Sequence, residues 1–301
     1  MSDIRFDNRV VIVTGAGSGL GKCYAIEFAK RGAKVVVNDP GSSLDGSGQN
    51  AAAADVVVKE ITDAGGTAVA SYDSVATREG GEGIVKTAVD AFGTVDVLVN
   101  NAGIIRDKSI LKLTEEDWDQ VTAVHQKGAF CVTQPALAIM KEKKFGRIVN
   151  TSSGAGIYGN FGQTNYAAAK MALVGLMNSI FVECAKHNIT CNCIAPLAAS
   201  RMTENLMPPE VFEKLKPEFI APLVLYLCSE KSTVNRMIFN CAGGWFSRTE
   251  IKCSPGVVLG DGKRSITPEE IEENLDKITN IDDGKIHTHL METFAYLSGV
   301  M

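Results

Sequence analysis

The chain has 301 residues, of which 45% are hydrophobic and 22% are charged, which is enough to bury a large globular core. The net charge of -5, with both signs mixed along the chain, predicts no interaction with nucleic acid. Apolar runs such as Ile220–Cys228 are too short to insert in a membrane, and the start MSDIRFDNRVVIVTG is not a targeting peptide. Eight scattered cysteines without a C-x-x-C pair indicate reduced thiols.

Short apolar segments typical of buried β-strands alternate with helical segments along most of the chain. The first, VVIVTG at Val10–Gly15, is β-branched and apolar on both sides. Helical spacing follows in Gly19–Arg31 and returns in Arg78–Phe92, Glu115–Val124 and Gln163–His187. Such alternation predicts βαβ crossovers, hence a doubly wound α/β fold of Rossmann type with a mostly parallel sheet of seven strands. The other six strand segments are AKVVVND, TAVASYD, VDVLVNNAG, GRIVNTSS, NITCNCIAP and RMIFNCAG.

The last part of the chain lacks strand signals and carries a well-marked helix start in SITPEEIEENLDKI. Thr267 is suited to the N-cap, Pro268 to the first helical position and Glu270 to a capping box. We expect a main α/β domain over residues 1–246 and a C-terminal helical extension over residues 247–301, which packs on the same domain or on a dimer partner. The apolar stripe that requires this packing is Ile271, Leu275 and Ile278.

A glycine-rich loop, TGAGSGLGK, follows the first strand and opens the first helix. Gly15 and Gly19 permit a tight turn and close approach of the backbone to a pyrophosphate, and Gly21 lets the helix pack near the strand. Ser18 and Leu20 belong to the same loop, where the N–H groups of the helix N-terminus attract phosphate. The spacing differs from G-x-G-x-x-G, and a purely structural turn is the alternative, but the position between strand and helix favours a dinucleotide site.

Asp39 ends the second strand, about 20 residues after the glycine loop. A carboxylate at this position accepts hydrogen bonds from both ribose hydroxyls of an adenosine and repels a 2′-phosphate. No Arg or Lys follows before Lys59, so the sequence favours NAD over NADP. The alternative is that Asp39 only caps the following loop, the Gly/Ser-rich segment Pro40–Asn50.

Tyr166 and Lys170 in NYAAAK are four residues apart, which places them on one face of a helix, one turn apart. A free phenol is a poor base near neutral pH, but a neighbouring ammonium favours the phenolate and so lowers the pKa of the tyrosine. Such a tyrosine can take the proton of an alcohol while hydride leaves the adjoining carbon. Ser153, at the end of the fifth strand, is expected to hold the reacting oxygen. The alternative is an ordinary Tyr and Lys pair on an exposed helix face.

Together with NNAG at Asn100–Gly103, these motifs resemble those of the short-chain dehydrogenase/reductase family over about residues 5–245. The resemblance implies that NNAG stabilises the sheet and lies along the cofactor. It also implies that Lys170 grips the nicotinamide ribose beside Tyr166, and that Pro196 brackets the nicotinamide. The further cofactor-binding residues that it implies are Asp73 and Ser74 of YDSV, Asn101, Ala102, Gly103 and Thr203.

Two positions depart from the pattern of the wider family. His125 stands where most members carry an Asn that takes part in a proton relay with the active-site lysine. The resemblance therefore makes His125 a catalytic candidate, which either relays protons or only packs. Leu197 replaces the glycine that usually follows the proline after the sixth strand.

Longer segments, among them VVNDPG, VHQKGAF, GIYGNFGQTNYAAAK and IAPLAASRMTENLMP, are similar to one branch of the family, the (3R)-hydroxyacyl-CoA dehydrogenases of peroxisomal multifunctional enzymes. This branch also carries His at the position of His125. The resemblance implies NAD-dependent oxidation of a (3R)-3-hydroxyacyl-CoA to the 3-ketoacyl-CoA in fatty-acid β-oxidation. It also implies a homodimer through long helices such as Gln163–His187, and association with hydratase and sterol-carrier-like domains. The same resemblance implies a peroxisomal location, although the final SGVM is not an S-K-L peroxisomal signal. The alternative location is the cytoplasm.

Three other functions remain open at this point. A 3-oxoacyl-carrier-protein reductase shares the catalytic set but prefers NADPH, and a hydroxysteroid or other secondary-alcohol dehydrogenase differs in its pocket. A dinucleotide-sensing module without turnover is the alternative outside enzymes, and the intact catalytic set disfavours it. No metal site is expected, because His287-x-His289 has no convincing further ligands apart from Asp282 and Asp283.

Overall fold

Contacts between residues divide the chain into two compact units, Met1–Arg248 and Thr249–Met301, and each is described by itself. The first unit carries the candidate catalytic residues. Thr203, one of the expected cofactor-binding residues, lies outside the part of the chain that the structure describes. The computed structural model describes residues 3–43, 45–47, 52–198, 208–260 and 263–294.

A sheet of eight strands forms the centre of the first unit. Its strands are β1 Val10–Thr14, β2 Lys34–Asn38, β3 Thr67–Ser71, β4 Val97–Asn100, β5 Gly146–Thr151, β6 Ile189–Leu197, β7 Ile238–Ala242 and β8 Trp245–Thr249. Their order in the sheet is β3-β2-β1-β4-β5-β6-β7-β8, and neighbours from β3 to β7 pair in parallel. The order reverses at β1, which lies between β2 and β4, and doubly wound sheets bind their ligands at the carboxyl ends of strands at such a point. The predicted doubly wound α/β fold is confirmed.

The eighth strand is absent from the strands that the sequence predicts. Gly243 and Gly244 have positive φ angles of 52° and 86° and join β7 to β8. Two consecutive residues with positive φ are typical of a type I′ turn, which connects antiparallel strands. This glycine pair is the signal for a hairpin, but the side chains of Trp245 and Phe246 are exposed, so β8 lacks the pattern of a buried strand.

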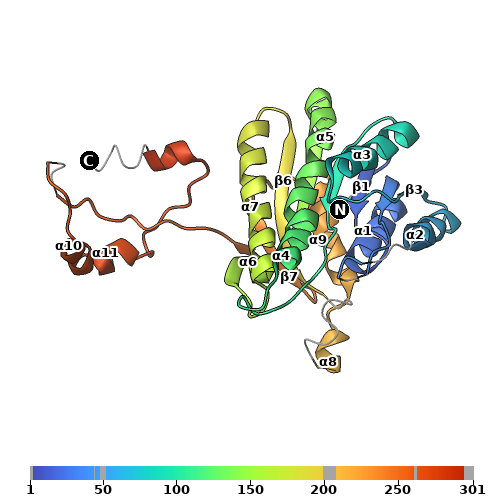
Figure 1. Ribbon diagram of the computed structural model, residues 1–301. Coiled ribbons are helices and arrows are strands. Elements are labelled where there is room, and N and C mark those ends of the chain that lie inside the picture. The colour runs from blue at the N-terminus through green and yellow to red at the C-terminus, as the bar shows by residue number, and fades with distance from the viewer. Residues whose placement is uncertain (1–2, 44, 48–51, 199–207, 261–262, 295–301) are drawn as a thin grey trace. The chain divides into compact units, whose positions relative to one another are not determined.

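Helices cover both faces of the sheet (Figure 1). On one face α1, α2 and α9 pack on a hydrophobic cluster, and on the other face α3, α5 and α7 pack on a second cluster. Val11 and Val13 of β1 belong to the first cluster, whereas Val10 and Ile12 belong to the second, as strand alternation requires. The helices of the first unit are α1 Gly19–Lys30, α2 Ala52–Asp63, α3 Arg78–Phe92, α4 Glu115–Thr122, η1 Ala123–Lys127, α5 Gly128–Lys143, α6 Gly154–Tyr158, α7 Thr164–Cys184, α8 Pro209–Phe212, η2 Pro217–Phe219 and α9 Ala221–Cys228.

The predicted helix Glu115–Val124 runs into a π-helical turn. The α-helix α4 ends at Thr122, and the five residues of η1 have π geometry before α5 begins at Gly128. Turns of this kind are rare and often lie at functional sites. Here η1 carries His125, which is almost completely buried.

The helix α7 begins with the NYAAAK segment and continues through the core. Leu173, Val174 and Met177 of α7 are buried in the second hydrophobic cluster. By length and composition alone, α7 is the one described helix that could cross a membrane, and core helices of globular proteins pass the same test. Its first turn carries Tyr166, and the next turn carries Lys170.

The described part of the second unit contains short helices and many exposed apolar side chains. The helix α10 (Pro268–Glu273) has the predicted capping box, because the Thr267 hydroxyl accepts from the N–H of Glu270 and the Glu270 carboxylate accepts from the N–H of Thr267. The prediction of one continuous helix through Ile271, Leu275 and Ile278 is wrong, because the chain turns at Asn274 before α11 (Leu275–Thr279). The side chain of Asn274 donates to the carbonyl of Glu270 at 2.9 Å and so replaces a backbone bond of the helix.

Candidate active site

The loop between β1 and α1 has the shape that its glycines predict. Gly15 and Gly19 have positive φ angles of 63° and 54°. A Cβ on Gly21 would lie 2.2 Å from the carbonyl oxygen of Gly15, so only glycine allows this contact between helix and strand. A Cβ on Gly19 would meet no atom within 4 Å, so the space in front of the N-terminus of α1 is open. Ser18 is the N-cap of α1 and Leu20 follows Gly19, and the N–H groups of a helix N-terminus attract an anion.

The Asp39 carboxylate is fixed by two backbone donors just after β2. The N–H of Gly17 donates to Oδ2 at 2.8 Å, and the N–H of Gly41 donates to Oδ1 at 2.7 Å. Asp39 therefore caps its own loop and also contacts the glycine loop. The position of Asp39, next to the open N-terminus of α1, is thus compatible with both expected roles. These roles are the binding of the adenosine ribose and the capping of the following loop.

The NNAG segment ties β4 to the glycine loop. The side-chain amide of Asn101 donates to the carbonyl oxygens of Thr14 and Gly15 at 3.0 and 3.1 Å. The hydroxyl of Thr14 accepts from the backbone N–H groups of Asn101 and Ala102 at 3.0 and 3.1 Å. These bonds hold the carboxyl ends of β1 and β4 together at the point where the strand order reverses.

Ser153 and Tyr166 come together although they belong to different elements. Ser153 is the N-cap of α6, directly after β5, and its hydroxyl accepts from the N–H of Ala155 at 3.1 Å. Burial raises the pKa of Tyr166 to about 12, while a hydrogen bond with Ser153 lowers this pKa and the negative charge of Asp107 raises it. In the protein alone the pKa of Tyr166 is therefore raised, because the loss of hydration has the larger effect.

Lys170 is buried one turn beyond Tyr166. Its Nζ donates to the carbonyl oxygen of Thr151 at 2.6 Å and lies 5.5 Å from the centre of the Tyr166 ring. The hydroxyl of Ser152 donates to the carbonyl of Lys170 at 2.8 Å, which joins α7 to the end of β5. Burial lowers the pKa of Lys170 to about 7. This amine can therefore gain or lose its proton near neutral pH.

His125 packs against the Tyr166 ring. The two rings meet edge to face with their centres 5.1 Å apart. The Nε2 atom of His125 lies 2.7 Å from the carbonyl oxygen of Ile104, and a Cβ on Gly103 would lie 2.5 Å from the imidazole. Burial lowers the pKa of His125 well below its usual value, and the positive charge of Lys170 adds to this effect. The imidazole is therefore neutral near pH 7, and its buried Nδ1 has no hydrogen-bond partner among the described residues.

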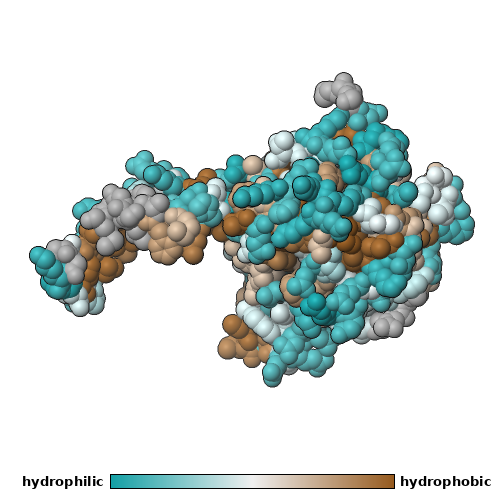
Figure 2. Space-filling view, turned by 90° about the horizontal axis from the view of Figure 1, so that it is seen from above, coloured by the Kyte–Doolittle hydropathy of each residue, from teal (hydrophilic) through white to brown (hydrophobic). Residues whose placement is uncertain are grey.

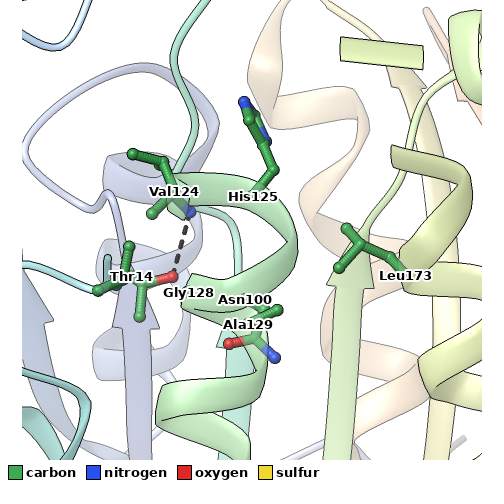
Figure 3. Close-up of a pocket in the computed structure, with 9 residues that line it drawn as sticks. Thr14, Asn100, Val124, His125, Gly128, Ala129 and Leu173 are labelled. Carbon is green, nitrogen blue, oxygen red and sulfur yellow. Dashed lines mark hydrogen bonds between the residues drawn. The ribbon is translucent and has the colours of Figure 1, made fainter. Parts of the chain in front are cut away.

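A small cavity lies beside His125, between the ends of β1 and β4, η1 and the helices α5 and α7 (Figure 3). Its volume is about 10 Å³, which is far too small for a substrate. The side-chain amide of Asn100 lines it and donates to Thr133 Oγ1 and Asn150 Oδ1, both at 2.9 Å. The cavity is part of the packing behind the site.

The remaining predicted cofactor-binding residues lie at the same edge of the sheet. Asp73 and Ser74 follow β3 and are exposed. Pro196 lies near the end of β6, opposite Cys241 of β7, and is half-buried. Thr203 falls outside the described residues. The structure thus brings the glycine loop, Asp39, NNAG and the four catalytic candidates to the carboxyl ends of the parallel strands, as the fold requires.

Two polar residues near Tyr166 are missed by the sequence reasoning. Asn165 directly precedes Tyr166 and is completely buried, with its side chain bonded to three backbone groups. Asn is a common residue at helix starts, so its position before the catalytic Tyr is the one signal in the sequence. Asp107 acts on the phenol from the loop after β4, and no sequence pattern predicts where that loop lies.

The two histidines of the second unit do not form a metal site with the residues described. His287 Nδ1 and His289 Nε2 lie 3.9 and 3.7 Å from the carboxylate of Glu292. Among the described residues, no three His, Cys, Asp or Glu side chains are grouped as ligands of a metal ion.

Comparison with known proteins extends these observations. Peroxisomal multifunctional enzyme A of Dictyostelium discoideum is 53% identical over 298 residues, which cover 99% of this chain and 65% of that protein. The solved structure of the full-length peroxisomal multifunctional enzyme type 2 of Drosophila melanogaster is 41% identical, with a TM-score of 0.83, and the match covers 99% of this chain and 50% of that chain. This chain therefore spans less than two thirds of the length of both relatives.

A smaller solved structure matches as well. A 7α-hydroxysteroid dehydrogenase, solved with NADH and 7-oxo glycochenodeoxycholic acid, is 31% identical with a TM-score of 0.72, over 81% of this chain and 98% of that chain. The model of the short chain dehydrogenase family matches residues 9–210, which include the glycine loop, NNAG, Ser153, Tyr166 and Lys170. On its fold, its motifs and these matches, the chain belongs to the short chain dehydrogenase family.

Proposed function

We propose that the protein oxidises the 3-hydroxyl of a (3R)-3-hydroxyacyl-CoA to a ketone with NAD, in fatty-acid β-oxidation. The observation that carries this proposal is the contact of Ser153 with Tyr166 beside the buried Lys170. A binding module without turnover has no use for a half-buried phenol that is hydrogen-bonded to a hydroxyl and lies one turn from a buried amine. This arrangement suits proton transfer to or from an oxygen atom.

Each of the three side chains has a chemical task. The hydroxyl of Ser153 holds the oxygen of the reacting alcohol, and Tyr166 takes the alcohol proton. Since burial raises the pKa of Tyr166 to about 12, the phenol needs nearby positive charge to give up its own proton near neutral pH. Lys170 supplies such charge in its protonated form and exchanges a proton near neutral pH. When bound, NAD supplies the hydride acceptor and a further positive charge.

His125 supports Tyr166 in this scheme. Its edge-to-face contact fixes one side of the Tyr166 ring, and its neutral state adds no charge that would compete with Lys170. The Nε2 atom lies within hydrogen-bond distance of both the carbonyl oxygen and the N–H of Ile104, at 2.7 and 3.1 Å, so Nδ1 is the ring nitrogen that is left for proton exchange. We therefore keep His125 as a catalytic candidate that acts through the position of the phenol.

The residues around the N-terminus of α1 fit a dinucleotide. The open side of Gly19 leaves room that a side chain would fill, and the helix N-terminus favours a pyrophosphate. The Asp39 carboxylate lies beside the glycine loop, where it suits free ribose hydroxyls and repels a 2′-phosphate. The first basic residue after Asp39, Lys59, is exposed and donates to Asp63 at 2.7 Å, so it is not directed to such a phosphate. These contacts favour NAD over NADP.

The substrate class rests on the sequence resemblance and on the relatives. The similarity to peroxisomal multifunctional enzymes supports a peroxisomal location. The sequence resemblance implies the acyl-CoA substrate and the association with hydratase and sterol-carrier-like domains. The similarity to a hydroxysteroid dehydrogenase supports a bulkier secondary alcohol as the second candidate.

A spectrophotometric assay of NADH formation tests the proposed function. We expect turnover of (3R)-3-hydroxyacyl-CoA with NAD and a kcat/KM about 10²-fold lower for the (3S) isomers, because the wrong hand directs the hydroxyl away from the Ser153 and Tyr166 pair. NADPH consumption with a 3-oxoacyl-carrier protein tests for the rival reductase. NADH formation with hydroxysteroids tests for the rival hydroxysteroid dehydrogenase. Absence of turnover with every (3R) chain length contradicts the proposal.

We also propose that two copies associate through α4, α5 and α7, which lie side by side on one face of the sheet (Figure 1). Trp118 of α4, Phe130 of α5 and Met171 and Val182 of α7 are large apolar side chains that remain exposed. Gly175 of α7 is exposed as well, and no atom lies within 4 Å of its Cβ position, so another helix can approach closely. An apolar face of this kind suits a two-fold dimer.

We further propose that the second unit covers the acyl site of the partner in this dimer. Leu111 and Phe161 of the first unit are 96% and 91% exposed, on two loops that are joined by the backbone bridge of Lys108 and Gln163. The second unit shows apolar surface in Figure 2 and has a pocket of about 400 Å³ lined mainly by apolar side chains. Exposed apolar side chains of this kind suit an apolar partner, and a fatty acyl chain is apolar too.

Deleting residues 265–301 separates these two proposals. We expect the full chain and the truncated chain to sediment as dimers, because the helices α4, α5 and α7 remain. We also expect kcat/KM for long acyl-CoA to fall about 10-fold, while short acyl-CoA changes by less than about threefold, because only a long chain buries enough CH₂ groups against the extension. If the full chain is a monomer, the proposed dimer is wrong. If kcat/KM falls equally for all acyl chain lengths, the proposed covering of the acyl site is wrong.

A further inference from the structure

Asn165 is a completely buried polar residue that the proposed reaction does not use. It directly precedes Tyr166 in the first turn of α7, where backbone N–H groups have no partner within the helix. The N-cap residue, Gln163, makes no capping hydrogen bond with its side chain. Instead, the Asn165 side-chain oxygen accepts from the N–H of Tyr166 at 2.8 Å. The backbone of Tyr166 is thus fixed by its neighbour.

The nitrogen of the same side chain holds two other segments against the start of α7. It donates to the carbonyl oxygen of Arg106 at 3.2 Å and to that of Asp117 at 3.1 Å. Arg106 lies in the loop after β4, which also pairs with the start of α7 through the bridge between Lys108 and Gln163. Asp117 lies in the first turn of α4. One amide therefore joins three segments at the catalytic tyrosine.

The α4 end of this junction is rigid. The Asp117 carboxylate is 4% exposed and accepts from the Thr114 hydroxyl at 2.6 Å and from Lys108 Nζ at 2.5 Å. Thr114 in turn completes a capping box at the start of α4. The side chain of Asn165 is therefore anchored to a residue whose own carboxylate is held by Thr114 and Lys108.

The loop end of the junction carries groups that act on the phenol. Ile104 in this loop holds His125 through its carbonyl oxygen, and His125 packs on the Tyr166 ring. Asp107, next to Arg106 in the chain, contributes a negative charge near the phenol. A shift of the loop would therefore move both His125 and this charge relative to Tyr166.

From these contacts we propose that Asn165 is a positioning residue of the oxidation, which fixes the Tyr166 phenol relative to Ser153 and His125. The inference rests on the proposed role of Tyr166 as the group that takes the alcohol proton. An amide suits the task because its oxygen accepts from one backbone group while its nitrogen donates to two others. An aspartate offers no donor for the two carbonyls, and an alanine offers neither.

The test compares Asn165→Ala and Asn165→Asp with a matched control, Asn192→Ala. Asn192 in β6 is equally buried, and its side chain makes the same kinds of bond: it donates to the carbonyl of Val234 at 2.9 Å and accepts from the N–H of Met237 at 3.1 Å. Melting temperature, cofactor binding by fluorescence, kcat and the pH profile of kcat are measured for all three variants and for Tyr166→Phe.

We expect both alanine variants to melt at lower temperature and to bind the cofactor within about twofold of the parent, because neither side chain lies at the glycine loop. Asn165→Ala is expected to lower kcat about 10²-fold with KM little changed, since a small misplacement of a catalytic group has this cost, whereas Asn192→Ala stays within about threefold. Asn165→Asp keeps the acceptor for the N–H of Tyr166 but adds negative charge, so its pH profile moves to higher pH by about one unit.

Equal kcat values for Asn165→Ala and Asn192→Ala overturn the proposal. If Asn165→Ala does not fold, Asn165→Asp decides, because it keeps the side-chain volume and the acceptor for the N–H of Tyr166. A parent-like kcat and pH profile of Asn165→Asp then overturn it. Retained activity of Tyr166→Phe overturns the proposed function itself, whatever the Asn165 variants do, so the two failures are distinguishable.

Discussion

Replacing Tyr166 by Phe is expected to lower kcat about 10³-fold, because the phenol is the group that takes the alcohol proton. The change removes one oxygen atom and leaves the ring, so the edge-to-face contact with His125 and the backbone bond from Asn165 remain. Cofactor affinity is expected to stay within about twofold, because the glycine loop and Asp39 are untouched. Stopped-flow measurement of NADH formation, with cofactor binding measured by fluorescence, separates the two quantities.

Tyr158→Phe is the control for this prediction. Tyr158 ends α6, is largely exposed, and accepts a hydrogen bond from Asn240 at 3.1 Å. Its loss is expected to change kcat by less than about threefold, because its hydroxyl has no proton to transfer in the reaction. If Tyr166→Phe keeps more than about a tenth of the parent kcat, the base is another group and the assignment of Tyr166 is wrong.

The pH profile gives a second view of the same group. In the direction of oxidation, kcat rises with pH as Tyr166 loses its proton. Ser153 lowers the pKa of Tyr166 through its hydrogen bond, so the profile of a Ser153→Ala variant should rise at higher pH than that of the parent.

The fold follows from local patterns, and the exceptions have local causes. The seven parallel strands are recognisable because they are short, β-branched and apolar on both sides, as in Val10–Thr14. The eighth strand is missed because its side chains are exposed and its signal is the turn at Gly243 and Gly244. The break at Asn274 is missed because the apolar stripe continues through it, while a single side-chain bond to Glu270 ends the helix.

The candidate site is only partly readable from sequence. Spacing alone places Tyr166 and Lys170 on one helix face, because the helical period is fixed. Their protonation states follow from burial, which depends on how α7 packs against β5 and η1, and no local pattern contains that information. The same reason explains why the π turn at His125 escapes prediction: its extra residue leaves the apolar spacing of the helix almost unchanged.

Lys170→Met should abolish turnover and at the same time stabilise the protein at low pH. The pKa of Lys170 is lowered to about 7 from 10.5 by burial, so between these two values the unfolded chain binds a proton that the native protein does not. The free energy of unfolding of the parent therefore falls as pH falls from about 10.5 to about 7, by about 5 kcal/mol at most, and levels off below. Met has nearly the same length and carries no charge, so the variant lacks this dependence.

The lost bond to the carbonyl of Thr151 offsets about 1–3 kcal/mol of the gain. We expect Lys170→Met to exceed the parent in the free energy of unfolding by about 2–4 kcal/mol at pH 6, and to be equal or less stable above pH 10.5. Urea unfolding at fixed protein concentration over this pH range measures the difference, with the exposed Lys186→Met as the control that should show no such change. A Lys170→Met variant that is less stable than the parent at every pH would mean that the native amine is charged and well paired. A more stable but inactive variant would mean instead that the fold carries a buried, poorly solvated amine at a cost in stability because the reaction requires it.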